Sequence, residues 1–183
     1  MPETYKIKIA GLERDLSVCP INENLSIAAF ILFSDVEMTV AASRELLRKV
    51  PEFDVIITPE AKSIPLAYEM ARQSGKNYVV ARKNAKLYMR EPFSVEVNSI
   101  TTMGMQKLYL GQDEAKLLKD KKVLVADDVI STGESLAAVL ELVKIAGGNV
   151  VSSCAVLAEG DAAERTDIVF LEKLPLISEN EVT

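Results

Sequence analysis

Histidine is absent from this chain of 183 residues, and so is tryptophan. Without an imidazole side chain, no catalytic triad, zinc site or proton shuttle that depends on histidine can form. Cysteine is scarce: Cys19 and Cys154 are the only two, and their spacing matches no metal-binding motif. Because both lie in apolar, strand-like segments, we expect two buried, reduced thiols.

Long apolar runs are missing as well. No segment approaches the roughly 20 apolar residues that a membrane-spanning helix needs, and residues 1–15 lack the basic and then apolar pattern of a secretory signal. We therefore expect a cytoplasmic protein without a membrane partner. Acidic residues outnumber basic ones by 27 to 21, and the net charge of −6 disfavours a nucleic-acid partner.

The composition that remains is typical of a folded protein. Hydrophobic residues make up 49% of the chain and charged residues 26%. A chain of this length buries a core without disulfides or a metal ion. Since no internal repeat or flexible linker divides it, we expect a single domain over residues 1–183.

Strands and helices alternate from residue 34 onward. Short apolar runs predict buried strands at 53–58, 77–81, 122–126, 150–157 and 167–171. Helical patterns are found at 37–50, 64–74 and 134–146. The alternation predicts an α/β fold whose central, mostly parallel sheet is flanked by helices. Two short strands and an apolar segment are expected within residues 5–33, and a hairpin or a mobile arm within 90–110.

The most informative segment is VLVADDVISTGES, residues 123–135. A buried strand leads to Asp127 and Asp128, and a short turn with Gly133 then opens a helix. The N-terminus of a helix favours a phosphate group, and a glycine lets the backbone approach it closely. The two carboxylates suit sugar hydroxyls or Mg²⁺ instead. Together these features predict a site for a ribose 5-phosphate.

A purely structural interpretation competes with this one. Ser131 and Glu134 have the spacing of a capping box, so both side chains could simply start the helix. A Walker-type nucleoside triphosphatase is excluded, because the chain has no G-x-x-x-x-G-K-[ST] loop.

The same segment resembles the phosphoribosyl pyrophosphate (PRPP) motif of type I phosphoribosyltransferases, which is a hydrophobic strand, two acids, two apolar or small residues and a T-G turn. Three further strings resemble the adenine phosphoribosyltransferase branch. Residues 58–71 resemble its pyrophosphate loop and the following helix, 78–88 its R-K-x-x-K string, and 93–99 its catalytic loop.

The resemblance implies an enzyme. It would transfer the 5-phosphoribosyl group from PRPP to a purine base, with adenine favoured and pyrophosphate released, using Mg²⁺ and acting as a homodimer. It also implies a small hood, built from about residues 1–33 and 158–183, over a core of about 34–157. Some residue of the hood, or Phe30 or Phe33, would pack against the purine.

The resemblance also implies the site residues. The catalytic residues would be Glu96, Asp127 and Asp128, and the two aspartates would help hold Mg²⁺, largely through water and PRPP. The residues that bind PRPP would be Glu60, Ala61, Lys62, Ser63, Arg82, Lys83, Lys86, Asp127, Asp128, Ser131, Thr132, Gly133, Glu134 and Ser135.

Three positions depart from the branch's usual pattern. Val97-Asn98 stands for the Tyr-Gly of the catalytic loop, Glu134 for the second glycine of the turn, and Lys62 for an arginine. Lysine keeps the charge but loses the bidentate geometry of arginine. The sequence leaves open a xanthine or hypoxanthine/guanine phosphoribosyltransferase, or a PRPP-binding regulator without catalysis.

Overall fold

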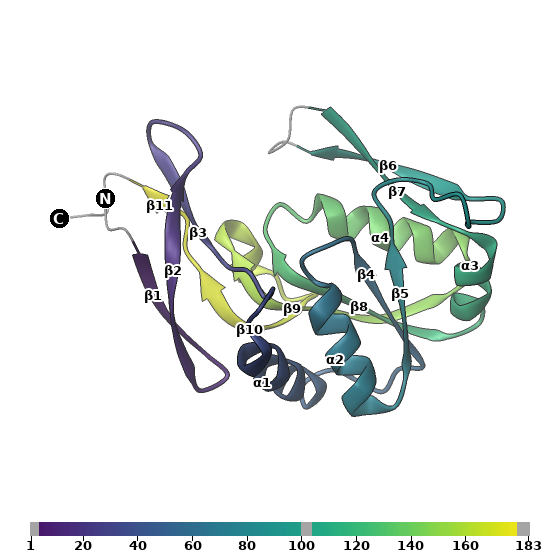
Figure 1. Ribbon diagram of the computed structural model, residues 1–183, viewed down its shortest axis with the longest axis horizontal. Helices are drawn as coiled ribbons and strands as arrows, with labels where there is room; N and C mark the ends of the chain where they lie inside the picture. The colour runs from purple at the N-terminus through teal and green to yellow at the C-terminus, as the bar shows by residue number, and fades with distance from the viewer. Residues whose placement is uncertain (1–3, 100–103, 179–183) are drawn as a thin grey trace.

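A parallel sheet of five strands forms the centre of the protein (Figure 1). The computed structural model describes residues 4–99 and 104–178. The strand order is β10-β9-β8-β4-β5, and every neighbouring pair is parallel. The strands are β4 (Val55–Pro59), β5 (Asn77–Ala81), β8 (Lys122–Ile130), β9 (Asn149–Glu159) and β10 (Val169–Leu174). The predicted α/β fold with a parallel central sheet is confirmed.

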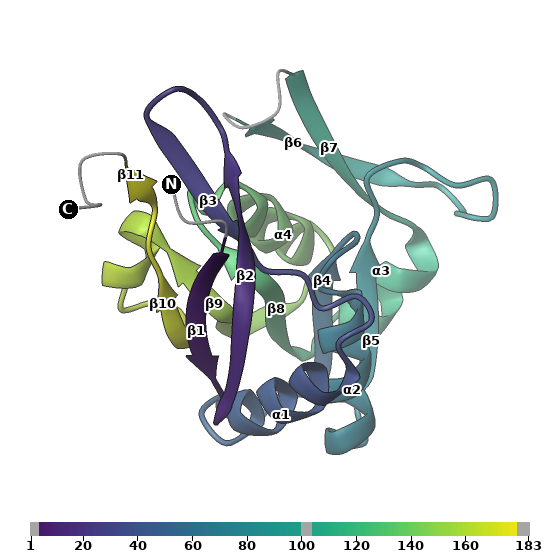
Figure 2. The same ribbon diagram turned by 60° about the vertical axis from the view of Figure 1, so that its left-hand side comes forward.

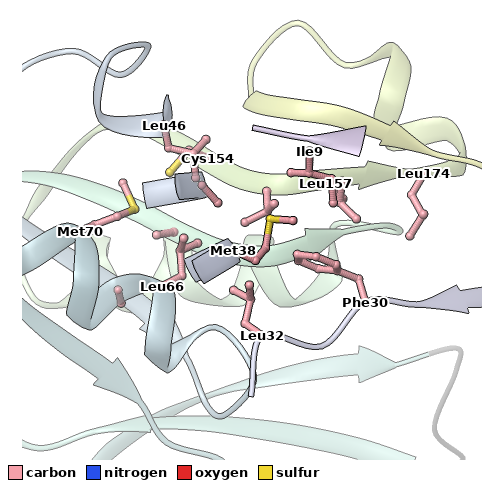
Figure 3. Packing of buried hydrophobic residues seen from close by; sticks show 14 of the residues in the cluster. Ile9, Phe30, Leu32, Met38, Leu46, Leu66, Met70, Cys154, Leu157 and Leu174 are labelled. Carbon is pink, nitrogen blue, oxygen red and sulfur yellow. The ribbon is translucent and has the colours of Figure 1, made fainter. Parts of the chain in front are cut away.

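Helices cover both faces of this sheet because successive strand residues point to opposite sides. Ile56 and Leu124 pack with α1 (Val36–Leu47) and α2 (Ile64–Ser74) in one apolar cluster (Figure 3). Their neighbours Ile57 and Val125 pack on the other side with α4 (Glu134–Ile145) and the end of α3 (Gln112–Leu118). Each central strand is therefore apolar on both faces, which explains the continuous apolar runs.

A second, antiparallel sheet forms the hood in the order β1-β2-β3-β11 (Figure 2). Its strands are β1 (Thr4–Ile9), β2 (Leu12–Pro20), β3 (Leu25–Ala29) and β11 (Ile177–Ser178). Strands from the N-terminal and the C-terminal parts of the described chain contribute to it. β10 lies in the central sheet instead, so only the segment after Leu174 joins the hood, not all of 158–183. The apolar pattern of a strand does not reveal which sheet it joins.

Residues 93–99 and 104–110 form the two strands of a hairpin. β6 (Phe93–Ser99) and β7 (Gly104–Leu110) are antiparallel, with Phe93 opposite Leu110. The hairpin packs on α4 (Figure 1). Leu108 and Leu110 of β7 are buried in the same apolar cluster as residues of α4.

Some local predictions were wrong. The first helix ends at Leu47, short of Pro51, and the short helix α3 was not predicted at all. The strand expected at 122–126 continues to Ile130, because pairing with β9 carries it through both aspartates. Cys19 is exposed on β2, whereas Cys154 is buried as expected.

The order of the strands places a crevice at the middle of the sheet. After β4 the chain moves outward to β5, and it then returns to place β8 on the other side of β4. In sheets of this kind, ligands bind beyond the carboxyl ends of the strands at such a reversal. The loops after β4 and β8 meet there.

Candidate active site

A turn of residues 131–135 connects β8 to α4; we call it the phosphate turn. Gly133 occupies the N-cap position of α4 with a left-handed backbone at φ 81°. Beside the turn is a small hollow lined by Asp127, Val129, Ile130, Ser131, Thr132, Gly133, Ser135 and Leu136. The first N–H groups of a helix have no intrahelical acceptors, so they are available to an anion here.

The capping-box interpretation of this turn is wrong. The helix begins at Glu134 with Gly133 as its N-cap, so Ser131 lies outside the capping position, and no side chain caps this helix end within the described residues. A glycine N-cap has no side chain to compete with a ligand for the N–H groups of the first turn. Thr132 and Ser135 are exposed and can add their hydroxyl groups.

Asp127 and Asp128 are consecutive residues of β8, so their side chains leave opposite faces of the strand. Asp127 faces the hollow, and its Oδ1 accepts a hydrogen bond of 2.9 Å from the N–H of Asp128. Burial, reinforced by the neighbouring Asp128 carboxylate, raises the pKa of Asp127 well above its usual 3.8. Asp128 is buried and turned toward Lys62, whose Nζ lies 3.7 Å from its Oδ2.

The loop after β4, residues 60–63, is tied to the segment after β5. The Glu60 carboxylate accepts a 2.8 Å hydrogen bond from the N–H of Lys83, and its Oε1 lies 3.7 Å from Nε of Arg82. The Glu60–Ala61 peptide bond is cis. The loop that carries Lys62 and the segment that carries Arg82 and Lys83 are thus held together beside the crevice. Glu60 joins the two loops through these contacts.

The hydroxyl of Ser63 makes its hydrogen bonds within the loop and does not cap α2. Ser63 occupies the N-cap position of α2, yet its hydroxyl donates to the carbonyl of Pro59 at 2.9 Å and accepts from Thr58 Oγ1 at 2.8 Å. The side chain is almost fully buried. It therefore braces the loop from below, while Ala61 and Lys62 present the exposed surface.

Glu96 is not brought into contact with the two aspartates among the described residues. It lies opposite Lys107 in the β6–β7 hairpin, and the two side chains form an exposed ion pair of 2.9 Å. Lys86 lies in the turn after β5, where its N–H points to Met89 Sδ at 3.4 Å. The side chains of Val97 and Asn98, which differ from the catalytic-loop pattern that this segment resembles, lie outside the described part of the structure.

Sequence reasoning missed two charged residues beside this crevice. Glu159 ends β9, where burial raises its pKa and the nearby charge of Lys62 acts in the opposite direction. Arg165 follows the short helix η1 (Gly160–Glu164) and lies against Gly133. Neither sits in a recognisable motif; only the order of the strands shows that the end of β9 adjoins that of β8.

The two phenylalanines expected to pack against the purine base differ in their burial. Phe30 is buried in the core between the hood and α1 (Figure 3), so its side chain presents little surface to a ligand. Phe33 is half-exposed and keeps that predicted role.

The carboxylates of β8 can supply only part of the coordination shell of Mg²⁺. Asp128 Oδ2 is buried without a hydrogen-bond partner among the described residues. No group of three or more His, Cys, Asp or Glu side chains could hold a metal in residues 4–99 and 104–178. Mg²⁺ is commonly bound by one or two carboxylates, with substrate phosphates and water completing its shell. The residues therefore fit a metal ion that arrives with a phosphorylated ligand.

No helix in the described part of the chain has the length and apolar character needed to cross a membrane.

Comparisons with known proteins identify the family of this chain. Residues 37–181 match the family described as phosphoribosyl transferase domain. An adenine phosphoribosyltransferase of Thermotoga maritima is 38% identical over 104 residues, which span 55% of this chain and 56% of that protein. A hypoxanthine/guanine phosphoribosyltransferase of Methanococcus voltae is 31% identical over 153 residues, 84% of this chain and 75% of that protein.

Solved structures share the fold. The crystal structure of adenine phosphoribosyltransferase from Thermoanaerobacter pseudethanolicus matches with a TM-score of 0.68 at 22% identity, and the match covers 93% of this chain and 95% of that one.

Proposed function

The chain belongs to the phosphoribosyl transferase domain family, and from this premise we propose that it transfers the phosphoribosyl group of PRPP to a purine base, with adenine favoured. One observation carries the proposal. The paired acids of β8 lie between the phosphate turn on one side and Lys62 on the other. A ligand with a phosphate at each end and a sugar between them matches that order of charges.

Each part of PRPP has a place in this scheme. The 5′-phosphate occupies the hollow at residues 131–135, where it meets the N-terminus of α4. Asp127 and Asp128 accept hydrogen bonds from the ribose hydroxyls. The pyrophosphate lies toward Lys62, Arg82, Lys83 and Lys86, whose charges offset those of the leaving group.

The proposed reaction is a displacement at the anomeric carbon. A ring nitrogen of the base forms a bond to that carbon, the bond from carbon to the pyrophosphate oxygen breaks, and the base loses the proton of that nitrogen. We assign Glu96 as the acceptor of this proton after the hairpin closes over the bound substrates. Positive charge grows on the sugar in the transition state, and the nearby aspartates stabilise it.

Mg²⁺ would neutralise charge on PRPP and stabilise the departing pyrophosphate. Asp127 and Asp128 would help hold it, mainly through water and PRPP. We also propose, as the family resemblance implies, that the protein acts in the cytoplasm as a homodimer.

Hypoxanthine or guanine is the second candidate for the base. The Methanococcus voltae relative aligns over a larger share of the chain than the Thermotoga protein does. Xanthine and a regulator that binds PRPP without reacting are the remaining alternatives.

Pyrophosphate release tests the proposal. The chain is incubated with Mg²⁺ and PRPP, and adenine, hypoxanthine, guanine, xanthine or orotate is added separately. We expect release with adenine and its loss in an Asp127→Asn/Asp128→Asn variant. Release with another base would support the proposed reaction and identify that base as the substrate instead of adenine. Binding of PRPP without release for any base would contradict catalysis and favour the regulator.

A further inference from the structure

We propose that Arg165 binds the 5′-phosphate of the ligand as a side-chain partner of the phosphate turn. The inference rests on the proposed function and adds to it a residue that lies outside every motif noted above. Arg165 follows η1, in the connection between β9 and β10, and this yellow-green connection lies beside the start of α4 (Figure 1).

The guanidinium group lies directly against Gly133. A Cβ atom built on Gly133 would be 2.5 Å from Nη1 of Arg165 and 3.8 Å from its Cζ. Gly133 is the N-cap of α4 and lines the hollow. A phosphate that accepts hydrogen bonds from the first N–H groups of α4 therefore comes within reach of Nη1.

Asp167 holds the arginine in this orientation. Nε and Nη2 of Arg165 donate to the two carboxylate oxygens of Asp167 at 2.9 and 2.7 Å. Neither bond uses Nη1, the nitrogen nearest Gly133. A guanidinium fork fixed at one edge presents its remaining donors without further loss of side-chain freedom.

The charge balance of the hollow calls for such a cation. A phosphate monoester carries close to two negative charges at neutral pH, whereas a helix N-terminus supplies only about half a positive charge. Asp127 lines the hollow, and Glu134 is the first residue of the helix. With two acids next to the turn, backbone N–H groups alone would hold a dianion weakly.

Calorimetric titration of the full chain separates the two ends of the PRPP site. Ribose 5-phosphate probes the phosphate turn, and inorganic pyrophosphate probes the opposite, lysine-rich side. We expect Arg165→Gln to raise the Kd for ribose 5-phosphate by about 10- to 100-fold, the range for a charged hydrogen bond. The Kd for pyrophosphate should change less than threefold, and Arg165→Lys should give an intermediate value for ribose 5-phosphate.

Steady-state kinetics gives a second readout. Arg165→Gln should raise the KM for PRPP much more than it lowers kcat, because the phosphate is held in both the ground state and the transition state. Arg90→Gln is the matched control: Arg90 pairs with Asp113 through the same two nitrogens, at 3.1 and 2.7 Å, on an exposed surface. This control should leave both Kd values and the KM unchanged.

Four results would overturn the inference. If wild type and Arg165→Gln bind ribose 5-phosphate equally, Arg165 does not bind the phosphate. The proposed function would still stand if the wild type transfers the phosphoribosyl group. If Arg165→Gln weakens the binding of both probes equally, the loss is a general effect of charge. If Arg165→Lys loses as much thermal stability as Arg165→Gln but binds ribose 5-phosphate with wild-type affinity, the role of Arg165 is purely structural. A wild-type chain that binds neither probe would refute the proposed function together with this residue.

Discussion

At the scale of single residues, the most consequential feature is a carboxylate held where its charge is disfavoured. Asp127 lies near the end of β8 next to Asp128, and burial together with that neighbouring carboxylate raises its pKa well above 3.8. Folded protein thus binds a proton at Asp127 more tightly than unfolded protein does. Stability is therefore lost as the pH rises from about 4 through the raised pKa.

Replacing Asp127 with asparagine should separate stability from activity. The amide keeps an oxygen that can accept the N–H of Asp128 and removes the buried charge. We expect the melting temperature at pH 7 to rise by about 2–4 °C for each kcal/mol gained in the free energy of unfolding, while pyrophosphate release is lost. The rise should shrink toward pH 4.

Calorimetric melts between pH 4.5 and 8 provide the check. The exposed Asp15→Asn on β2 is the control and should change neither property. An Asp127→Asn variant that melts below wild type at pH 7 would show that this charge is stabilised in the folded protein.

Gly133 combines two requirements at one position. Its left-handed backbone costs a residue with a Cβ about 1–2 kcal/mol, and the added carbon would push Arg165 away. Gly133→Ala should lower the free energy of unfolding by about that amount and also raise the KM for PRPP.

Gly147→Ala is a matched control, because Gly147 has a similar φ of 78° and its nearest neighbour to an added Cβ is Lys119, at 3.6 Å. Gly147→Ala should lower the free energy of unfolding by a similar amount and keep the wild-type KM for PRPP. Equal KM values for the two variants would show that only backbone strain matters at Gly133.

At the scale of elements, the proposed role of Glu96 depends on the β6–β7 hairpin. In this structure Glu96 is paired with Lys107 at the surface of the hairpin. An exposed pair of this kind contributes less than about 1 kcal/mol, so it can open when substrate binds.

Glu96→Gln should therefore lower kcat by at least about 100-fold, the range for a positioned general base, and change the melting temperature little. Lys107→Gln removes the same ion pair and should keep most of the activity. Stopped-flow or steady-state rates of the two variants provide the measurement. If both lose activity equally, the pair itself matters and Glu96 is not the base.

At the scale of the whole molecule, the hood and the central sheet share one core. Phe30 lies in a cluster with Ile9 of the hood, Met38 of α1 and Leu157 of β9 (Figure 3). Truncation of such a side chain leaves a cavity that costs about 3–5 kcal/mol.

We expect Phe30→Ala to lower the melting temperature by about 6–20 °C in a single transition. Phe33→Ala, at a half-exposed position in the same segment, should keep the melting temperature and raise the KM for the base. Two separate calorimetric transitions in Phe30→Ala would mean that the hood folds independently.

The sequence alone predicted a phosphate site at the β8 turn and determined the class of the fold. Parallel strands buried on both faces need continuous apolar runs, and a phosphate at a helix N-terminus needs a glycine and short polar side chains next to it. Those demands are local, so residues 123–135 express them directly. The length of β8, the place of β10, and the association of Arg165 with Gly133 were decided only by the tertiary structure. They depend on which strands become neighbours, and that pairing is set by the packing of the whole chain rather than by any segment on its own.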